Sequence, residues 1–195
     1  MSALVAVLLA YLLGSIPTGV LLARIAGVDV RSAGSGNIGA TNVARTAGRG
    51  LGILTLAGDV LKGLVPVVIV RALGEPDEVV AATGVAALAG HVFSIFLRMQ
   101  GGKGVATGAG VLIGLAPTFA PIPLAVFVGT FALSRMVSLA SIVAAVSAPI
   151  ALFLGGRSLP TTLATLTISV LIVWRHHENL SRLLDGTEPT FTSRK

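Results

Sequence analysis

The residues best suited to chemistry fall in three short polar stretches, of which the first is "GSGNIGATNVAR". Its glycines let the backbone approach an anion, and consecutive amides can form a binding nest. Arg45 adds a fixed positive charge whose fork of N–H donors suits a phosphate group. A flexible loop that caps the next helix is the alternative, but it does not require so many donors beside an arginine. The predicted phosphate ligands are Ser35, Gly36, Asn37, Gly39, Thr41, Asn42 and Arg45.

The second stretch is "QGGKGVAT", which runs from Gln100 to Thr107. Its glycines surround Lys103, and we expect a helix to begin directly afterwards. A helix N-terminus that follows glycines and a lysine is an anion site on general grounds. A tight turn, with a lysine that merely marks the cytoplasmic side, is the alternative. The predicted ligands are Gly101, Gly102, Lys103, Gly104 and Thr107.

The third stretch is "WRHHEN", where the last apolar run ends. His176 and Asn179 are three residues apart and therefore share a helix face. Glu178 can pair with Arg175 or with another basic residue nearby. The alternative is an interfacial belt with solvated histidines, which suits His177 better because it lies off the Asn179 face.

Several polar residues are expected at membrane depth, where polar groups are costly and usually functional. Asp59 and Lys62 are three residues apart, which predicts a structural ion pair on one helix face. His91 follows a glycine inside an apolar run, where it can hold a loop in place. Ser138 and Ser141 either bond back to their own helix backbone or line a site.

Together these stretches favour an enzyme that joins a soluble phosphorylated molecule to a lipidic one. The carboxylates are few and scattered, and no His/Asp/Glu cluster has metal-ligand spacing, so no metal site is predicted. The sequence has no G-x-S-x-G elbow, which argues against a serine hydrolase. A membrane transporter of a phosphate ester is the alternative function, although no inverted repeat is visible.

Transmembrane helices must position these residues. Of the 195 residues, 54% are hydrophobic and 11% are charged, whereas a soluble domain has about 25% charged residues. Pro17 removes a backbone donor within the first apolar run and predicts a kink there. The net charge of +6 indicates a basic cytoplasmic face rather than a nucleic-acid partner. The predicted spans are Ala3 to Ala26, Leu51 to Ala72, Val79 to Leu97, Val137 to Leu154 and Leu159 to Trp174.

The region from Val105 to Ser134 is too long for one span and carries Pro117, Pro121 and Pro123. Basic residues place the loop before this region and the C-terminal tail in the cytoplasm, which requires an even number of crossings between them. We therefore divide the region into two short helices. The prediction is an all-α, single-domain membrane protein (residues 1–195) with seven transmembrane helices, an outside N-terminus and a cytoplasmic C-terminus. The basic residues used are Arg24, Arg31, Arg45, Arg49, Arg98, Lys103, Arg175, Arg182, Arg194 and Lys195.

The motifs occur in an order that resembles a known family from Gly14 to Glu188. They are "GSIPTG", "SGNIGATNVAR", the D-x-x-K-G of Asp59 to Gly63, "GHVF" followed by "GGKGVAT", and "RHHEN" with "RLLDGTE". The sequence resembles the bacterial acyl-phosphate:glycerol-3-phosphate acyltransferase family, the PlsY type. The resemblance implies a multi-pass protein of the bacterial cytoplasmic membrane, with its active site facing the cytoplasm. It would acylate the 1-position of glycerol 3-phosphate from acyl phosphate, giving lysophosphatidic acid, with no cofactor. Membrane lipid is the other expected partner, and we expect a monomer.

By resemblance, the family's site residues fall on Ser35, Arg45, Lys103, His176 and Asn179, as catalytic residues. Ser141 matches a site serine, and Glu178 matches a structural support, as do Asp59 and Lys62 in their pair. His176 acts either as a general base or as an orienting group while a substrate phosphate accepts the proton; resemblance favours the second role. One position departs from the family pattern, because Ser94 stands where proline commonly follows "GH-x-F". That departure concerns the bend of the third span, not the chemistry.

Overall fold

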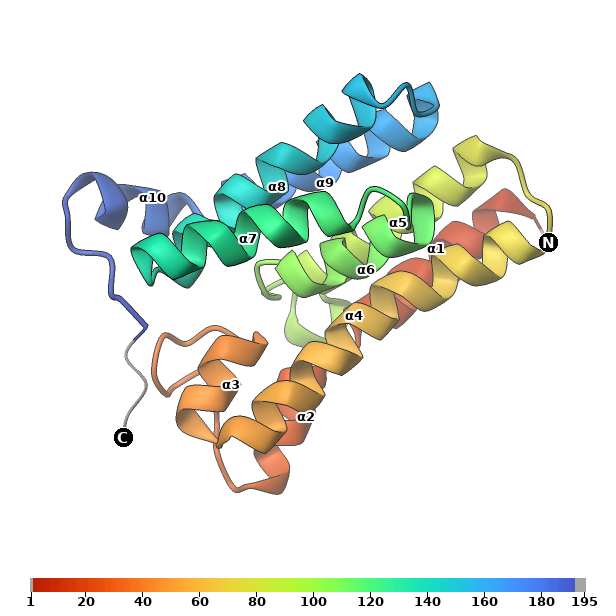
Figure 1. Cartoon of the computed structure of the whole chain (residues 1–195). Coiled ribbons are helices and arrows are strands. Elements are labelled where there is room, and N and C mark those ends of the chain that lie inside the picture. The colour runs from red at the N-terminus through yellow and green to blue at the C-terminus, as the bar shows by residue number, and fades with distance from the viewer. Residues whose placement is uncertain (1, 192–195) are drawn as a thin grey trace. The chain divides into compact units, whose positions relative to one another are not determined.

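The computed structural model describes residues 2–191, and every regular element in that range is a helix (Figure 1). The all-α prediction is confirmed. Arg194 and Lys195, used above to place the tail, lie outside the described residues. The helices are α1 (Ala3–Ser15), α2 (Thr18–Ile25), α3 (Ala40–Thr46), α4 (Arg49–Ala72), α5 (Asp77–Val92), the short 3-10 helix η1 (Ile95–Leu97), α6 (Val105–Leu115), α7 (Pro121–Ser134), α8 (Val137–Leu154), α9 (Leu159–Arg175) and α10 (His177–Leu184).

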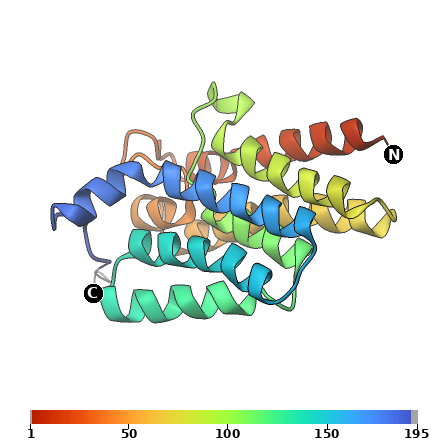
Figure 2. The same ribbon diagram turned by 90° about the horizontal axis from the view of Figure 1, so that it is seen from above.

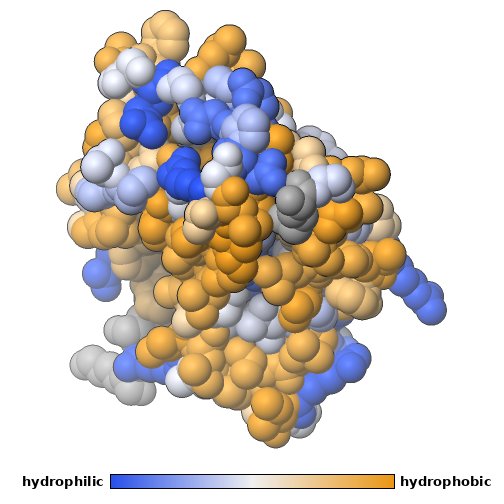
Figure 3. Space-filling view, turned by 90° about the vertical axis from the view of Figure 1, so that its right-hand side faces the viewer, coloured by the Kyte–Doolittle hydropathy of each residue, from blue (hydrophilic) through white to orange (hydrophobic). Residues whose placement is uncertain are grey.

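The long apolar helices match the predicted spans closely. Within the described range, four segments are long and apolar enough to cross a membrane, namely Ala3–Ile25, Arg49–Ala72, Asp77–Leu97 and Val137–Leu154. Three shorter apolar helices are α6, α7 and α9. The division of the proline-containing region into two helices is confirmed, because α6 ends at Leu115 and α7 begins at Pro121. Figure 3 shows a face on which hydrophobic atoms dominate and hydrophilic atoms gather in patches, as expected of a protein in lipid.

The chain divides into two compact units, one up to Leu115 and one from Ala116 onward. In the first unit, α1 lies along α5 and α4 lies along α6 (Figures 1 and 2). These helices approach closely because glycines of one helix face the backbone of its neighbour. A Cβ at Gly90 would collide with the Tyr11 carbonyl of α1, and a Cβ at Gly110 would collide with the Val60 carbonyl of α4. Small residues therefore allow the backbone contact that stabilises helix pairs in membranes.

The predicted kink in the first span is confirmed as a break between α1 and α2 at Ile16 and Pro17. Carbonyls at such a break need donors from elsewhere, since lipid offers none. The Ser94 hydroxyl donates to the Ser15 carbonyl at 2.6 Å, and the Lys62 ammonium donates to the Ile16 carbonyl at 2.8 Å. Ser94, the residue that departs from the family pattern, thus joins the end of α5 to the break.

Two charged side chains of α4 serve the structure of the first unit. Lys62 Nζ lies 2.8 Å from Asp59 Oδ1, and both side chains are buried, so the predicted structural ion pair is confirmed. Arg71 donates to the Gly114 carbonyl at 2.6 Å and to the Leu115 carbonyl at 2.9 Å. The last carbonyls of a helix have no partner within it, so Arg71 caps the C-terminus of the 11-residue helix α6.

In the second unit, α8 packs between α7 and α9 (Figure 2). The segment after α10 folds back, because the amides of Thr187 and Glu188 both donate to the Arg182 carbonyl. Phe191 then reaches the end of α7, where its amide donates to the Arg135 carbonyl at 2.7 Å. This return brings the Glu188 carboxylate beside α10.

We expect Ser94→Ala to lower the free energy of unfolding by about 1–3 kcal/mol, because the buried Ser15 carbonyl loses a donor. Ser147→Ala is the matched control, since Ser147 Oγ donates only within its own helix, to the Ala144 carbonyl. Thermal unfolding of both variants in the same detergent measures the difference. An S94A unfolding temperature equal to that of the S147A variant would contradict this role for Ser94.

Candidate active site

The first polar stretch is an ordered fold built around Asn42, which is 2% exposed. Its Nδ2 lies within hydrogen-bond distance of the carbonyls of Val30, Ala33 and Asn37, at 2.8 to 3.0 Å. Its Oδ1 accepts from the Ser35 amide at 2.9 Å. One buried amide side chain therefore fixes the path of the whole loop, so Asn42 shapes the loop from beneath. Part of the stretch is the short helix α3, which begins at Ala40.

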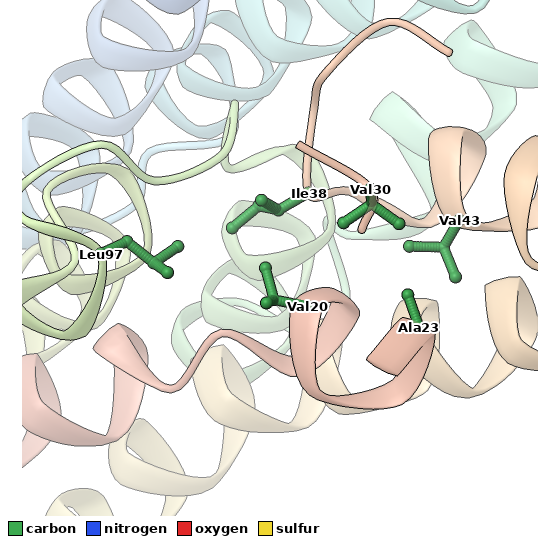
Figure 4. Packing of buried hydrophobic residues seen from close by; sticks show 6 residues of the cluster. All are labelled: Val20, Ala23, Val30, Ile38, Val43 and Leu97. Carbon is green, nitrogen blue, oxygen red and sulfur yellow. The ribbon is translucent and has the colours of Figure 1, made fainter. Parts of the chain in front are cut away.

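An apolar cluster anchors this loop to the rest of the first unit (Figure 4). Ile38 and Val30 from the loop pack with residues of α2 and with Leu97, which precedes the second polar stretch. The full cluster is Val20, Ala23, Val30, Ile38, Val43 and Leu97. On the surface above it, Arg31 Nη2 donates to Gln100 Oε1 at 2.9 Å. The structure thus brings the first and second polar stretches side by side.

The backbone amides of this loop bind oxygens of the protein itself and do not form the predicted anion nest. The amide of Gly36 donates to the Ala33 carbonyl, and the amide of Gly39 donates to Asn37 Oδ1. The Ser35 amide is likewise bound to Asn42. The nest is therefore not formed by these amides. The hydroxyl of Ser35 and the guanidinium of Arg45 lie on exposed residues, and Thr41 is half-buried, so side chains are the donors that the loop offers.

The second stretch, Gly101 to Gly104, lies against the C-terminal end of α5. The Gly101 amide donates to the Val92 carbonyl at 3.0 Å, and the Gly102 amide donates to the His91 carbonyl at 3.1 Å. A Cβ at Gly101 would collide with the His91 carbonyl, and a Cβ at Gly102 would collide with Nε2 of the His91 ring. These glycines are therefore required by packing, and their amides are committed to α5. His91 therefore contacts the loop through both its carbonyl and its ring.

Lys103 is half-buried where this stretch leads into α6, directly before the helix N-terminus at Val105. The first amides of a helix have no carbonyl partner within it and carry partial positive charge. Gly104 has a φ of 83°, a conformation that favours glycine, and so allows the turn into the helix. Thr107 is fully buried, with 0% exposure, inside the contact with α4. Lysine and helix N-terminus thus place positive charge together at this turn, whereas Thr107 contributes packing.

In the second unit, His176 occupies the joint between α9 and α10 and is 3% exposed. Its Nδ1 lies 2.7 Å from the Ile172 carbonyl. A carbonyl only accepts hydrogen bonds, so Nδ1 carries a proton, and Nε2 is the acceptor nitrogen of the neutral ring. His177 is exposed, as its position off the Asn179 face predicted.

Asn179 is buried and is held by the returning C-terminal segment. Its Nδ2 donates to Glu188 Oε1 at 2.6 Å, and Arg182 Nε donates to Glu188 Oε2 at 2.8 Å. Burial by itself would raise the pKa of the Glu188 carboxyl. The Ser138 hydroxyl, the Asn179 amide and the Arg182 guanidinium together lower the pKa by more than burial raises it, so the pKa lies below its ordinary value. The carboxylate is therefore ionised and orients the Asn179 amide.

The carboxylate that supports Asn179 is that of Glu188, which is not among the predicted site residues. Glu178 is exposed, and its carboxylate makes none of the ion pairs found among residues 2–191. Glu188 is the last residue of the motif "RLLDGTE", but the motif alone does not show that its carboxylate contacts Asn179. The folded-back segment shows that contact. Ser141, the predicted site serine, is buried and donates to the Val137 carbonyl of its own helix at 2.8 Å.

These features define a class of protein: a membrane protein whose regular elements within residues 2–191 are all helices, with two adjoining polar loops and with a buried histidine and a buried asparagine where α9 leads into α10. The family described as glycerol-3-phosphate acyltransferase matches residues 4–186. The chain belongs to this family.

Relatives of the same description match over nearly the whole chain. Glycerol-3-phosphate acyltransferase of Geotalea daltonii is 54% identical over 190 residues, 97% of this chain and 98% of the relative. That of Geobacter sulfurreducens is 53% identical over 182 residues, 93% of this chain and 94% of the relative. The fold is similar to crystal structures of PlsY (YgiH), an integral membrane glycerol 3-phosphate acyltransferase, in its glycerol 3-phosphate and lysophosphatidic acid forms. Both are 44% identical and cover 98% of this chain and 96% of theirs, with TM-scores of 0.94 and 0.93.

We expect Glu188→Gln to lower the free energy of unfolding by about 2 kcal/mol near neutral pH, because two charge-assisted contacts weaken. The folded pKa of Glu188 lies below that of an unfolded glutamate, which is about 4.3. Its stabilising contribution is therefore complete above that pH and is lost as the pH falls through the folded pKa.

Unfolding temperatures measured from neutral pH down to about pH 3 check this expectation. The gap between wild type and E188Q should narrow as the pH falls. Glu178→Gln is the control, because Glu178 is exposed and its loss should leave the unfolding temperature unchanged. A constant gap at every pH would show that the Glu188 charge does not stabilise the fold.

Proposed function

We propose that this chain transfers a fatty acyl group from acyl phosphate to glycerol 3-phosphate and releases phosphate. The observation that carries the proposal is the pair of adjoining polar loops in the first unit, one with Arg45 and one with Lys103 before a helix N-terminus. Two cationic loops side by side suit a reaction that must hold two phosphate groups close together. The names of the relatives and the substrate and product forms of the similar crystal structures support the same reaction.

The chemistry makes modest demands on the protein, because acyl phosphate is a mixed anhydride with a good leaving group. The glycerol 3-phosphate hydroxyl oxygen forms a bond to the acyl carbonyl carbon, and the bond from that carbon to the phosphate oxygen breaks. The hydroxyl proton passes to a substrate phosphate oxygen, and phosphate leaves. The protein's main tasks are to neutralise the two anions and to align hydroxyl and carbonyl.

The proposed role of each side chain follows from its charge and its hydrogen-bonding groups. Arg45 and Lys103 neutralise phosphate, and Ser35 donates a hydrogen bond. His176 accepts from the substrate hydroxyl at Nε2 while the Ile172 carbonyl fixes its ring, so the histidine orients glycerol 3-phosphate. Asn179 is oriented for substrate by Glu188. Other proposed substrate-side positions are Asn37, Thr41, Gly104 and Ser141, whereas Gly36, Gly39, Asn42, Gly101, Gly102 and Thr107 act by shaping the structure around the loops.

We also propose that the protein has seven transmembrane helices, an outside N-terminus and a cytoplasmic active site in the bacterial inner membrane, and that it acts as a monomer. The support is the charge distribution, because the basic residues of the first loop and of the loop before α6 gather on one side of the predicted spans. The acidic residues between α4 and α5 belong to the opposite side.

Purified protein in detergent should release inorganic phosphate from palmitoyl phosphate only when glycerol 3-phosphate is present. Phosphate release and lysophosphatidic acid are measured together, because they should appear in equal amounts. Absence of lysophosphatidic acid, with exchange of glycerol 3-phosphate across liposomes instead, would identify a transporter and reject the proposal.

Arg45→Ala should lower kcat/KM by at least about 100-fold, because a substrate phosphate loses its charge partner. Arg49→Ala removes an equally exposed charge nearby in the sequence and should retain activity. Unfolding temperatures of both variants should match the wild type. Similar activity losses in both variants would mean that net charge matters rather than a contact made by Arg45.

His176→Gln tests the choice between a base and an orienting group. If His176 orients substrate, we expect KM for glycerol 3-phosphate to rise and the pH dependence of kcat to keep its wild-type shape. A large loss of kcat at unchanged KM, with loss of the titration near pH 6 to 7, would show that His176 is the base.

A further inference from the structure

Three buried ionisable side chains of the first unit meet beneath the second polar stretch, and the reaction described above does not use them. Asp59 Oδ1 lies 2.8 Å from Lys62 Nζ and 3.8 Å from His91 Nδ1. Their side chains are only 3 to 5% exposed. We call this group the Asp59 hub; it joins α4 to α5.

The hub has two further contacts, one on each side. Lys62 donates to the Ile16 carbonyl at the break between α1 and α2. On the opposite side, Nε2 of His91 lies directly against Gly102, so closely that no side chain fits there. The His91 and Val92 carbonyls also receive the amides of Gly102 and Gly101. A continuous path of contacts therefore runs from the α1 break through Asp59 to the loop that carries Lys103.

Such a group is costly to place among apolar helices. A buried ion pair rarely stabilises a fold more than well-packed apolar residues would, and ionisable residues at membrane depth are usually functional. Apolar side chains could hold α4 against α5 equally well. They could not attract an imidazole ring by charge, whereas the Asp59 carboxylate, 3.8 Å from His91 Nδ1, attracts a ring that carries a proton on that nitrogen.

We infer that the Asp59 hub fixes the loop Gly101 to Gly104 against α5 and thereby sets the position of Lys103 for an anionic substrate. His91 is a positioning residue that acts through the glycine backbone, and Asp59 orients the His91 ring. This inference rests on the proposed function for the identity of the substrate, but the contact between His91 and the loop does not depend on it.

The test compares His91→Ala, which removes the ring, with His91→Gln, which restores a polar group at the reach of Nε2. Thr83→Val is the matched control, because Thr83 is fully buried in the same helix and bonds only to the Val79 carbonyl. Two readouts are used: hydrogen exchange of the peptide that contains residues 98–107, and KM with kcat for each phosphate substrate.

We expect H91A to speed exchange of the 98–107 peptide and to raise KM for at least one phosphate substrate about tenfold, with a smaller change in kcat. H91Q should recover most of both effects. T83V should lower the unfolding temperature without changing either readout. Unchanged exchange at 98–107 and unchanged KM in H91A, even with a lower unfolding temperature, would overturn the inference, because His91 would then only stabilise the fold.

The role of Asp59 is tested by Asp59→Asn with Lys62→Met, a double substitution that removes both charges together and avoids leaving one of them unpaired. It should reproduce the exchange and KM effects of H91A in a folded protein. If this double variant behaves as wild type, Asp59 does not orient His91. Hydrogen exchange needs no turnover, so a wild-type protein without acyltransferase activity would reject the proposed function and leave the inference about the loop testable.

Discussion

The polar backbone of this protein must find its hydrogen-bond partners inside the protein, because the surrounding hydrocarbon supplies none. Two irregular segments of the first unit obtain these partners from particular side chains. The break between α1 and α2 is satisfied by Ser94 and Lys62, and the loop before α3 is satisfied by Asn42. A polar site beside a lipid-facing bundle exists only because these internal partners hold its backbone in place.

The same constraint separates residues that build the site from residues that are available to act. Asn42, Gly101 and Gly102 have their polar groups committed to the protein. Ser35 and Arg45 stand on exposed positions above this framework. In the second unit, Glu188 fixes one side of Asn179, and the Ile172 carbonyl fixes one nitrogen of His176. Rigid support beneath the side chains of a polar site is the arrangement that preorganises it for anions.

Much of this architecture could be predicted from the sequence, because the relevant signals are local. Apolar runs predicted the long helices, and Pro17 predicted the break in the first of them. The spacing of Asp59 and Lys62 predicted their ion pair. The errors concern contacts between residues that are distant along the chain or that depend on backbone direction. Donors of "GSGNIGATNVAR" were assigned to an anion, yet the amides of Gly36 and Gly39 bind loop oxygens. The contact of Glu188 with Asn179 was not predicted, because no periodicity predicts that the tail turns back at Gly186.

The cap that Arg71 places on α6 has a consequence for the surrounding bilayer. An 11-residue helix is about 16 Å long, roughly half the thickness of a hydrocarbon core. Its terminal carbonyls receive their donors from α4, so the length of α6 does not have to match the membrane. Hydrophobic mismatch is then taken up by the longer helix α4, whose 24 residues can tilt. Because Arg71 ties the end of α6 to α4, a tilt of α4 would carry α6 and the loop before it along.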